Sequence, residues 1–313
     1  MTKPLPRRLS IVHVRRLAFL AIIIAACIGA AAQVVGDLRI LELRSAVFGN
    51  TRRIRVLLPP GYDAAANRDR RYPVLYLNDG QNLFDAATSV FNPMEWKVDE
   101  SVAALTATHE IQPLIIVGID SVGRRGRATE YLPFADVYLR PPEPNVRGRN
   151  YPRFISDEVM PLINANFRTR TGREFTGIGG SSYGAVAALF AALERPDLFG
   201  RLLLESPSLY IGEGKLLDYL RRMRHWPARV YIGVGTNEGA RPTCDPADRN
   251  SEAVQDVQAL ADDIARASAS TRLRVIVEPC AVHNEDAWSR RFPAAMKFLY
   301  SVKITKPSEN SAK

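Results

Sequence analysis

The stretch GIGGSSYGAVAALFAAL, residues 177–193, sets two serines among glycines and then continues as an apolar run. The residues before it, REFTGIGG (173–180), have the pattern of a short strand, and the apolar run has the length of a helix. A strand that passes through a tight turn into a helix is the repeating unit of α/β domains. This stretch therefore predicts a parallel sheet covered by helices.

Other segments extend the same pattern along the chain. Apolar, β-branched runs bounded by turn residues predict strands within 52–63, 72–80, 112–120, 200–208, 228–236 and 272–280. Helical spacing appears at 154–167, 252–267 and 286–300. Because strands and helices alternate through the second half, we expect a mostly parallel central sheet with helices on both faces. In such sheets the functional residues lie on loops beyond the carboxyl ends of the strands.

The first 32 residues have the composition of an export signal. They contain five basic residues and no acidic residue, followed by the apolar run LAFLAIIIAACIGAAA. We expect cleavage after Ala32, with two alternatives open: lipidation at Cys27, or retention as a membrane anchor. All three place the body of the protein, residues 33–305, outside the cytoplasm, and leave 306–313 as a flexible polar tail.

Charge gives little reason to expect a nucleic-acid partner. The whole chain has a net charge of +9, but residues 33–313 carry 37 basic and 33 acidic side chains, a net of +4. No stripe of alternating basic and aromatic residues is present. No spaced cluster of His, Cys and carboxylates suggests a metal, and we expect no cofactor. Contact with a membrane is expected only through the N-terminal segment.

Two cysteines, Cys244 and Cys280, remain outside the export signal. In an oxidising compartment an even pair favours a disulfide. The alternative is two unpaired buried thiols.

The two serines allow one frame of the motif G-x-S-x-G, Gly180 to Gly184, with Ser182 at its centre. Between a strand and a helix this motif forms a sharp turn that exposes the serine hydroxyl as a nucleophile. The N–H of Tyr183 then points toward a developing oxyanion. The alternative is a glycine turn in which Ser182 only caps the helix.

A serine nucleophile requires a base, and four histidines are available. His13 lies in the export signal, His109 precedes the nucleophile, and His225 lies on the entry side of a strand. His283 follows the strand expected at 272–280, on its exit side. In this order of nucleophile, acid and histidine, His283 is the expected base.

The acid is expected after another strand, between the serine and the histidine. Glu238 directly follows the strand at 228–236, and Asp245 in the same loop is the second candidate. A second oxyanion donor is also needed. The turn at Asp79-Gly80 ends an earlier strand, so the N–H of Gln81 is the expected donor; an ordinary turn is the alternative.

These residues resemble the putative-esterase family of α/β-hydrolases, which includes esterase D, enterochelin esterases, feruloyl and acetyl-xylan esterase domains and mycolyltransferases. The resemblance rests on VLLPPGYD, YPVLYLNDGQNLFD, MEWKVDE, EYLPF, GGSSYGAVAALFAAL, GVGTNEG and HNEDAWSRRFPAAMKFL, which span residues 45 to 300. It implies the α/β-hydrolase fold. It also implies Ser182 as nucleophile, His283 as base, Glu238 as acid, and the N–H groups of Gln81 and Tyr183 as oxyanion donors.

The resemblance also matches Asp79, Arg127, Glu130 and Tyr131 to a loop that is structural or faces the substrate. Ala185 stands where many relatives have a second glycine.

For substrate binding we consider Trp96, Arg127 and Tyr131, with ordinary core packing as the alternative for the two aromatic residues. The basic runs at 123–127 and 146–149 suggest an anionic substrate if they rim the cleft; a solvated surface is the alternative.

The expectation is an exported serine carboxylic-ester hydrolase that forms an acyl-enzyme on small siderophore or carbohydrate-linked esters. Two alternatives use the same fold. One is an acyltransferase with the same three residues, and the other is a non-catalytic binding protein.

Overall fold

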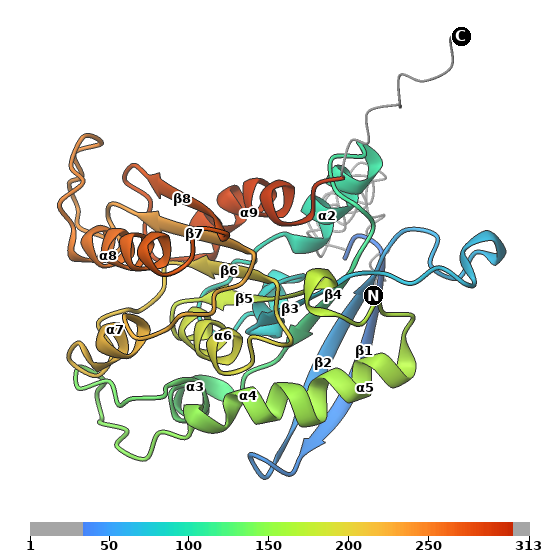
Figure 1. Cartoon of the computed structure of the whole chain (residues 1–313), viewed down its shortest axis with the longest axis horizontal. Coiled ribbons are helices and arrows are strands. Elements are labelled where there is room, and N and C mark those ends of the chain that lie inside the picture. Colours follow the sequence, from blue (N-terminus) through green and yellow to red (C-terminus); the bar gives the residue numbers. More distant parts are fainter. Residues whose placement is uncertain (1–33, 303–313) are drawn as a thin grey trace, which may run out of the picture. The chain divides into compact units, whose positions relative to one another are not determined.

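Eight strands form one sheet in the computed structural model, which describes residues 34–302 apart from the side chain of Arg125. The expected export signal and the polar tail lie outside the described residues. The strand order is β1-β2-β4-β3-β5-β6-β7-β8 (Figure 1). The strands are β1 (Asp37–Ser45), β2 (Asn50–Leu58), β3 (Val74–Asn78), β4 (Ile115–Ile119), β5 (Thr176–Ser181), β6 (Arg201–Glu205), β7 (Arg229–Gly235) and β8 (Arg272–Glu278).

The sheet is antiparallel at one end and parallel elsewhere. Strand β1 pairs antiparallel with β2, and β2 pairs antiparallel with β4. All pairings from β4 through β3, β5, β6 and β7 to β8 are parallel. Each strand that we expected is present, and the mostly parallel sheet is confirmed. Strand β1 was not expected from the sequence.

Helices cover both faces of the sheet, as predicted (Figure 1). Helices α2 (Val98–Ala107) and α9 (Glu285–Tyr300) pack on one face. The other face carries α3 (Gly123–Tyr131), α4 (Tyr151–Arg153), α5 (Met160–Asn166), α6 (Tyr183–Glu194), α7 (Lys215–Leu220) and α8 (Glu252–Ala267). A π-helical segment, Phe154–Val159, joins α4 to α5.

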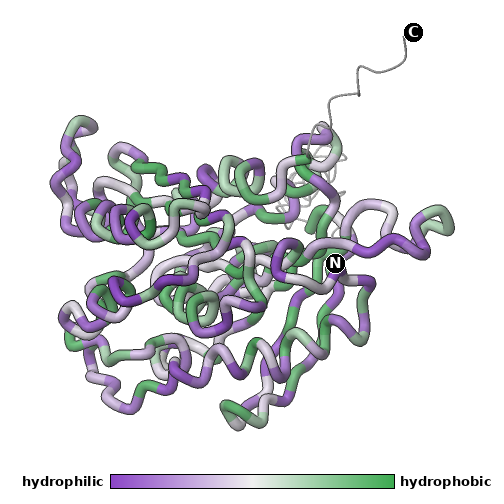
Figure 2. The backbone as a smooth tube through the Cα atoms, in the orientation of Figure 1, coloured by the Kyte–Doolittle hydropathy of each residue, from purple (hydrophilic) through white to green (hydrophobic). Residues whose placement is uncertain are grey.

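Strand β3 shows how the sequence fills two cores at once. Val74 and Tyr76 belong to the hydrophobic cluster under α6, whereas Leu75 and Leu77 belong to the cluster under α2 and α9. Alternate side chains of a strand point to opposite faces, so a strand covered on both sides must be apolar throughout. Hydrophobic residues accordingly concentrate within the sheet, and hydrophilic residues lie mainly in the outer loops and on the outer parts of helices (Figure 2).

Helix α6 is the central helix of its face. All residues from Gly184 to Leu193 are buried. A helix that is apolar all round belongs in the interior rather than at a surface. Because α6 begins at Tyr183, burial of this helix fixes the position of the turn that precedes it, and that turn contains Ser182.

Candidate active site

Ser182 occupies a strained turn between β5 and α6. Its backbone has φ 55° and ψ −127°, a conformation that non-glycine residues rarely adopt. The Ser182 N–H donates to the carbonyl of Glu205 at 3.0 Å, and the Ser182 carbonyl accepts from Ala185 and Val186 in the first turn of α6. Such strain costs about 1–3 kcal/mol and is retained where it serves function. The predicted strand–turn–helix context of Ser182 is therefore present.

The glycines beside Ser182 are required by the close approach of the chain to itself. A Cβ on Gly180 would lie 2.8 Å from the backbone of Gly184. A Cβ on Gly184 would lie 2.9 Å from Oδ2 of Asp79. The spacing of the motif is thus a packing requirement as well as a chemical one.

His283 and Glu238 meet beyond the ends of β8 and β7. His283 Nδ1 lies 2.6 Å from Oε2 of Glu238, which is within hydrogen-bond distance. The other candidate acid, Asp245, lies in an exposed loop and accepts a hydrogen bond from the N–H of Ala247. Of the two candidates, it is Glu238 that pairs with the histidine.

Glu238 is held by two further groups. Its Oε1 accepts from Ser206 Oγ at 2.7 Å and from the N–H of Gly235 at 2.5 Å. Burial raises the pKa of this carboxyl, but the hydrogen bond and charge of His283, with the bonds from Gly235 and Ser206, outweigh it and hold the pKa below its ordinary value. Glu238 is thus ionised at neutral pH, the state needed to orient a histidine.

Ser206 connects this carboxylate to the core. Its Oγ accepts from Nε1 of Trp288 at 3.0 Å, and the Trp288 ring stands edge-on to the His283 ring at 5.2 Å between centroids. Ser206 has a positive φ of 43° at the end of β6. The histidine is therefore flanked by a buried ring that is itself hydrogen-bonded to the group holding Glu238.

A buried ion pair lies beneath the same strand ends. Arg291 Nη2 lies 2.7 Å from Oε2 of Glu205, and Arg291 Nη1 lies 2.7 Å from Oε2 of Glu278. Glu205 is fully buried, and its backbone carbonyl is the acceptor for the Ser182 N–H. Sequence reasoning missed this arrangement and Ser206, because the partners are far apart in the chain.

Two neighbouring pockets share Ser182 and His283. The larger cleft has a volume of about 500 Å³, and its walls include Tyr183, Pro207, Leu209 and Tyr210. The smaller pocket has a volume of about 140 Å³, and its walls include Asp79, Asn82, Phe91, Asn92, Arg127 and Glu285. The serine and the histidine therefore stand where the two spaces meet.

The three expected substrate-binding residues have different outcomes. Arg127 lines the smaller pocket, where its Nη2 lies 2.8 Å from Oδ2 of Asp79. Trp96 and Tyr131 are buried and line neither of these two pockets, and their role in substrate binding stays a prediction. Trp96 packs against Trp288 and Phe292, and Tyr131 packs against Tyr151. Large aromatic rings gain more from full burial than from an open cleft.

The oxyanion-donor roles of Tyr183 and Gln81 stay predictions. The positions of the two residues are consistent with these roles. Tyr183 is the first residue of α6, and Gln81 lies in the turn Gly80–Asn82 that follows β3. Within residues 34–302 neither backbone N–H has a hydrogen-bond acceptor, as a donor reserved for substrate requires. The Tyr183 hydroxyl donates to Asp136, which fixes its ring at the cleft wall.

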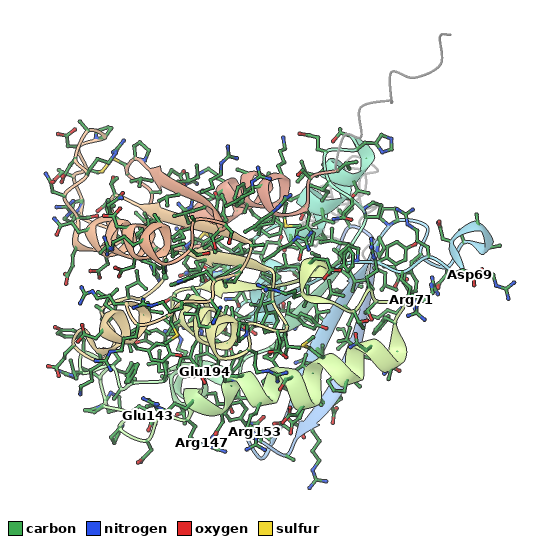
Figure 3. All side chains as sticks on the ribbon, in the orientation of Figure 1. Asp69, Arg71, Glu143, Arg147, Arg153 and Glu194 are labelled. Atoms are coloured by element: carbon green, nitrogen blue, oxygen red, sulfur yellow. A yellow bond between two sulfur atoms is a disulfide. The ribbon has the colours of Figure 1, made fainter. Side chains whose placement is uncertain are left out.

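The arginines of the basic runs whose side chains the structure describes, Arg124, Arg127, Arg147 and Arg149, do not line the larger cleft. Arg124 donates to the carbonyls of Val90 and Phe91, and Arg147 donates to the carbonyls of Val47 and Phe48. In the view of Figure 3, the label of Arg147 lies below the end of the helical segment that begins with α4. Arg127 does reach the smaller pocket, but with a carboxylate partner. These arginines therefore give no support to an anionic substrate.

The expected disulfide is confirmed between Cys244 and Cys280. Within the described residues, no group of three or more His, Cys, Asp or Glu is arranged to hold a metal ion. None of the helices in residues 34–302 is both long and apolar enough to cross a membrane.

Residues 45–299 match the family described as putative esterase. The chain is 23% identical to protein YbbA of Bacillus subtilis over 249 residues, covering 80% of this chain and 92% of that one. It is 30% identical to the iron(III) enterobactin esterase of Escherichia coli over 128 residues, but this covers 38% of this chain and 28% of that one.

Among solved structures, the enterobactin esterase of Shigella flexneri superposes with a TM-score of 0.62 at 20% identity, covering 86% of this chain and 61% of that chain. Likeness at this identity shows the fold, which is that of the α/β-hydrolases. The predicted fold class is thereby confirmed.

Proposed function

The chain belongs to the putative esterase family of carboxylic-ester hydrolases, and on that premise we propose that it is an exported serine esterase with Ser182 as nucleophile. One observation carries this proposal. A serine in a strained strand–helix turn shares its cleft with a histidine, and Nδ1 of that histidine lies 2.6 Å from the ionised Glu238. A glycine turn with a capping serine needs neither the histidine nor its acid.

The geometry supports a two-step hydrolysis. Glu238 occupies Nδ1 of His283, which leaves Nε2 to take the proton from Ser182 Oγ as that oxygen attacks the ester carbonyl. The negative charge that develops on the carbonyl oxygen is stabilised by the N–H groups of Tyr183 and Gln81. The carbon–oxygen bond to the alcohol then breaks, and His283 returns the proton to the leaving oxygen.

The acyl-enzyme is then cleaved by water. His283 takes a proton from the water, whose oxygen attacks the acyl carbonyl, and Ser182 leaves with that proton. Every proton in both halves of the reaction passes through one imidazole. The carboxylate of Glu238 orients that imidazole and stabilises its charged form.

Export is supported by two features of different kinds. The first 32 residues have the three parts of an export signal. The body carries a disulfide between Cys244 and Cys280, and such bonds persist in oxidising compartments outside the cytoplasm.

The test compares wild type with Ser182→Ala on p-nitrophenyl acetate and butyrate. A fluorophosphonate that reacts with activated serines is applied to both, and mass spectrometry locates the label. Wild type should turn over and carry the label on Ser182, whereas the variant should do neither. Ser289→Ala, a partly exposed position of α9 that lines neither pocket, is the matched control and should behave as wild type. A folded wild type that neither turns over nor labels would refute the proposal.

A further inference from the structure

The smaller pocket has a polar wall that the catalytic steps do not use. Glu285, the first residue of α9, is 1% exposed and lines this pocket. Its Oε1 accepts from Nδ2 of Asn82, and its Oε2 accepts from Nδ2 of Asn92, each at 3.1 Å. Within residues 34–302 no cation pairs with it. A buried carboxylate with only two amide donors still has acceptor capacity to offer.

Other residues that line this pocket combine charge and an aromatic ring. Arg127 is paired with Asp79 and its guanidinium lies 5.1 Å from the centroid of the Phe91 ring. The pocket as a whole therefore has two carboxylates and one guanidinium. This excess of negative charge and of hydrogen-bond acceptors disfavours an anion. It favours a neutral group that donates through hydroxyls and can rest its carbon atoms on a ring.

The orientation of the His283 ring indicates which half of an ester, the acyl group or the alcohol, occupies the smaller pocket. Nδ1 of His283 faces Glu238, and Glu238 lines the larger cleft but not the smaller pocket. Nε2, on the other flank of the ring, is the nitrogen that protonates the leaving alcohol. The larger cleft offers Pro207, Leu209 and Tyr210 to an apolar acyl group. The smaller pocket is then the place for the alcohol.

We propose that the smaller pocket is a subsite for a neutral, hydroxyl-bearing leaving alcohol, a polyol or sugar-like group, with Glu285 as the acceptor of its hydroxyl protons. This inference rests on the proposed esterase function. Asn82 and Asn92 fix the carboxylate, and Phe91 supports the carbon chain of the alcohol. The subsite therefore determines specificity and takes no part in proton transfer.

The test uses two butyrate esters that differ only in the alcohol. Glycerol 1-monobutyrate carries two free hydroxyls, and n-propyl butyrate carries none. Release of butyric acid is followed by titration for wild type, Glu285→Gln and Asn92→Ala. We expect wild type to favour the glycerol ester in kcat/KM by about tenfold or more, the value of one hydrogen bond to a charged group. Both variants should lose most of that preference.

Asp286→Asn is the matched control, because it removes one negative charge from the same helical turn. Asp286 is exposed, pairs with Arg290 and does not line the pocket. The preference of Asp286→Asn for the glycerol ester in kcat/KM should equal that of wild type. If Glu285→Gln does not fold, as judged by circular dichroism, Asn92→Ala decides the question.

The outcomes separate the subsite from the esterase. Wild type that hydrolyses both esters equally, or variants that keep the wild-type preference, would overturn the subsite and leave the esterase standing. A wild type that hydrolyses neither of these esters nor the p-nitrophenyl esters would overturn both.

Discussion

Cys244 and Cys280 join the loop that carries Glu238 to the loop that carries His283. Cys280 lies three residues before the histidine, and Cys244 lies six residues after the acid. The bridge thus spans the two loops whose relative position sets the hydrogen bond between Glu238 and His283. A covalent link at this place constrains the candidate site as well as the fold.

Removing the bridge should cost both stability and activity. The cysteines are 36 residues apart, and a loop of that length corresponds to about 4 kcal/mol in the chain-entropy description. We expect urea unfolding of Cys244→Ser/Cys280→Ser to show a free energy of unfolding lower by roughly this amount, with a reduced kcat. Dithiothreitol should reproduce both effects in wild type and change nothing in the double variant. Equal stability with and without reductant would contradict this role.

Glu238→Gln should lower kcat much more than it changes KM. The amide keeps the size of the side chain but cannot stabilise a charged imidazole, and loss of such an acid in related triads costs up to about 10⁴ in kcat. Steady-state kinetics with p-nitrophenyl butyrate measures the changes in kcat and KM. Asp245→Asn removes an exposed carboxylate from the same loop, so this control should keep wild-type kinetics. The reverse pattern would show that Asp245 is the functional acid.

The sequence predicts residues that follow strands better than residues that meet across the fold. Ser182, Glu238 and His283 each follow a strand, and parallel strands bring their carboxyl ends to one edge of the sheet. The local sequence pattern was therefore enough to expect these three residues at the same edge. The contact between Arg291 and Glu205 joins residues 86 apart and has no local signal. Ser206 and Glu285 were missed for the same reason.

The two buried aromatic residues show a different limit. Trp96 and Tyr131 are aromatic, and aromatic side chains suit a core as well as a pocket. Their neighbours in sequence do not distinguish these places, because the rings that cover Trp96 come from α9, almost two hundred residues later. Strand β1 was missed because its alternating pattern belongs to a half-exposed antiparallel edge rather than to the buried parallel runs.

Gly180→Ala should destabilise the protein through backbone contact alone. The added methyl would lie 2.8 Å from the carbonyl group of Gly184, so the strand and helix must separate. Overpacking of this kind costs about 1–3 kcal/mol. Thermal unfolding should show a lower midpoint. Gly239→Ala is the control, because its methyl would meet nothing within 4 Å and its midpoint should match wild type. Equal midpoints for both variants would mean that the turn tolerates expansion.

Glu205 should make stability depend on pH in a defined direction. Burial raises the pKa of this carboxyl from 4.5 to about 7, although the charge of Arg291 acts in the opposite sense. A group whose pKa is higher in the folded protein stabilises the fold fully below its unfolded pKa, and this contribution is lost as pH rises through the folded value. Between pH 4.5 and about 7, wild type should therefore lose stability relative to Glu205→Gln, whose amide does not titrate.

Urea unfolding of both proteins at several pH values across that window measures the difference. Arg291 keeps its contact with Glu278 in the variant, so the guanidinium is not left without a partner. Burial also raises the pKa of Asp99 to about 7, but Asp99 is the same in both proteins and cancels in the comparison. Parallel curves of unfolding free energy against pH for the two proteins would mean that Glu205 has the same pKa in the folded and unfolded states. A stability advantage of wild type that widens with rising pH would mean that the charge of Arg291 outweighs the effect of burial on this pKa.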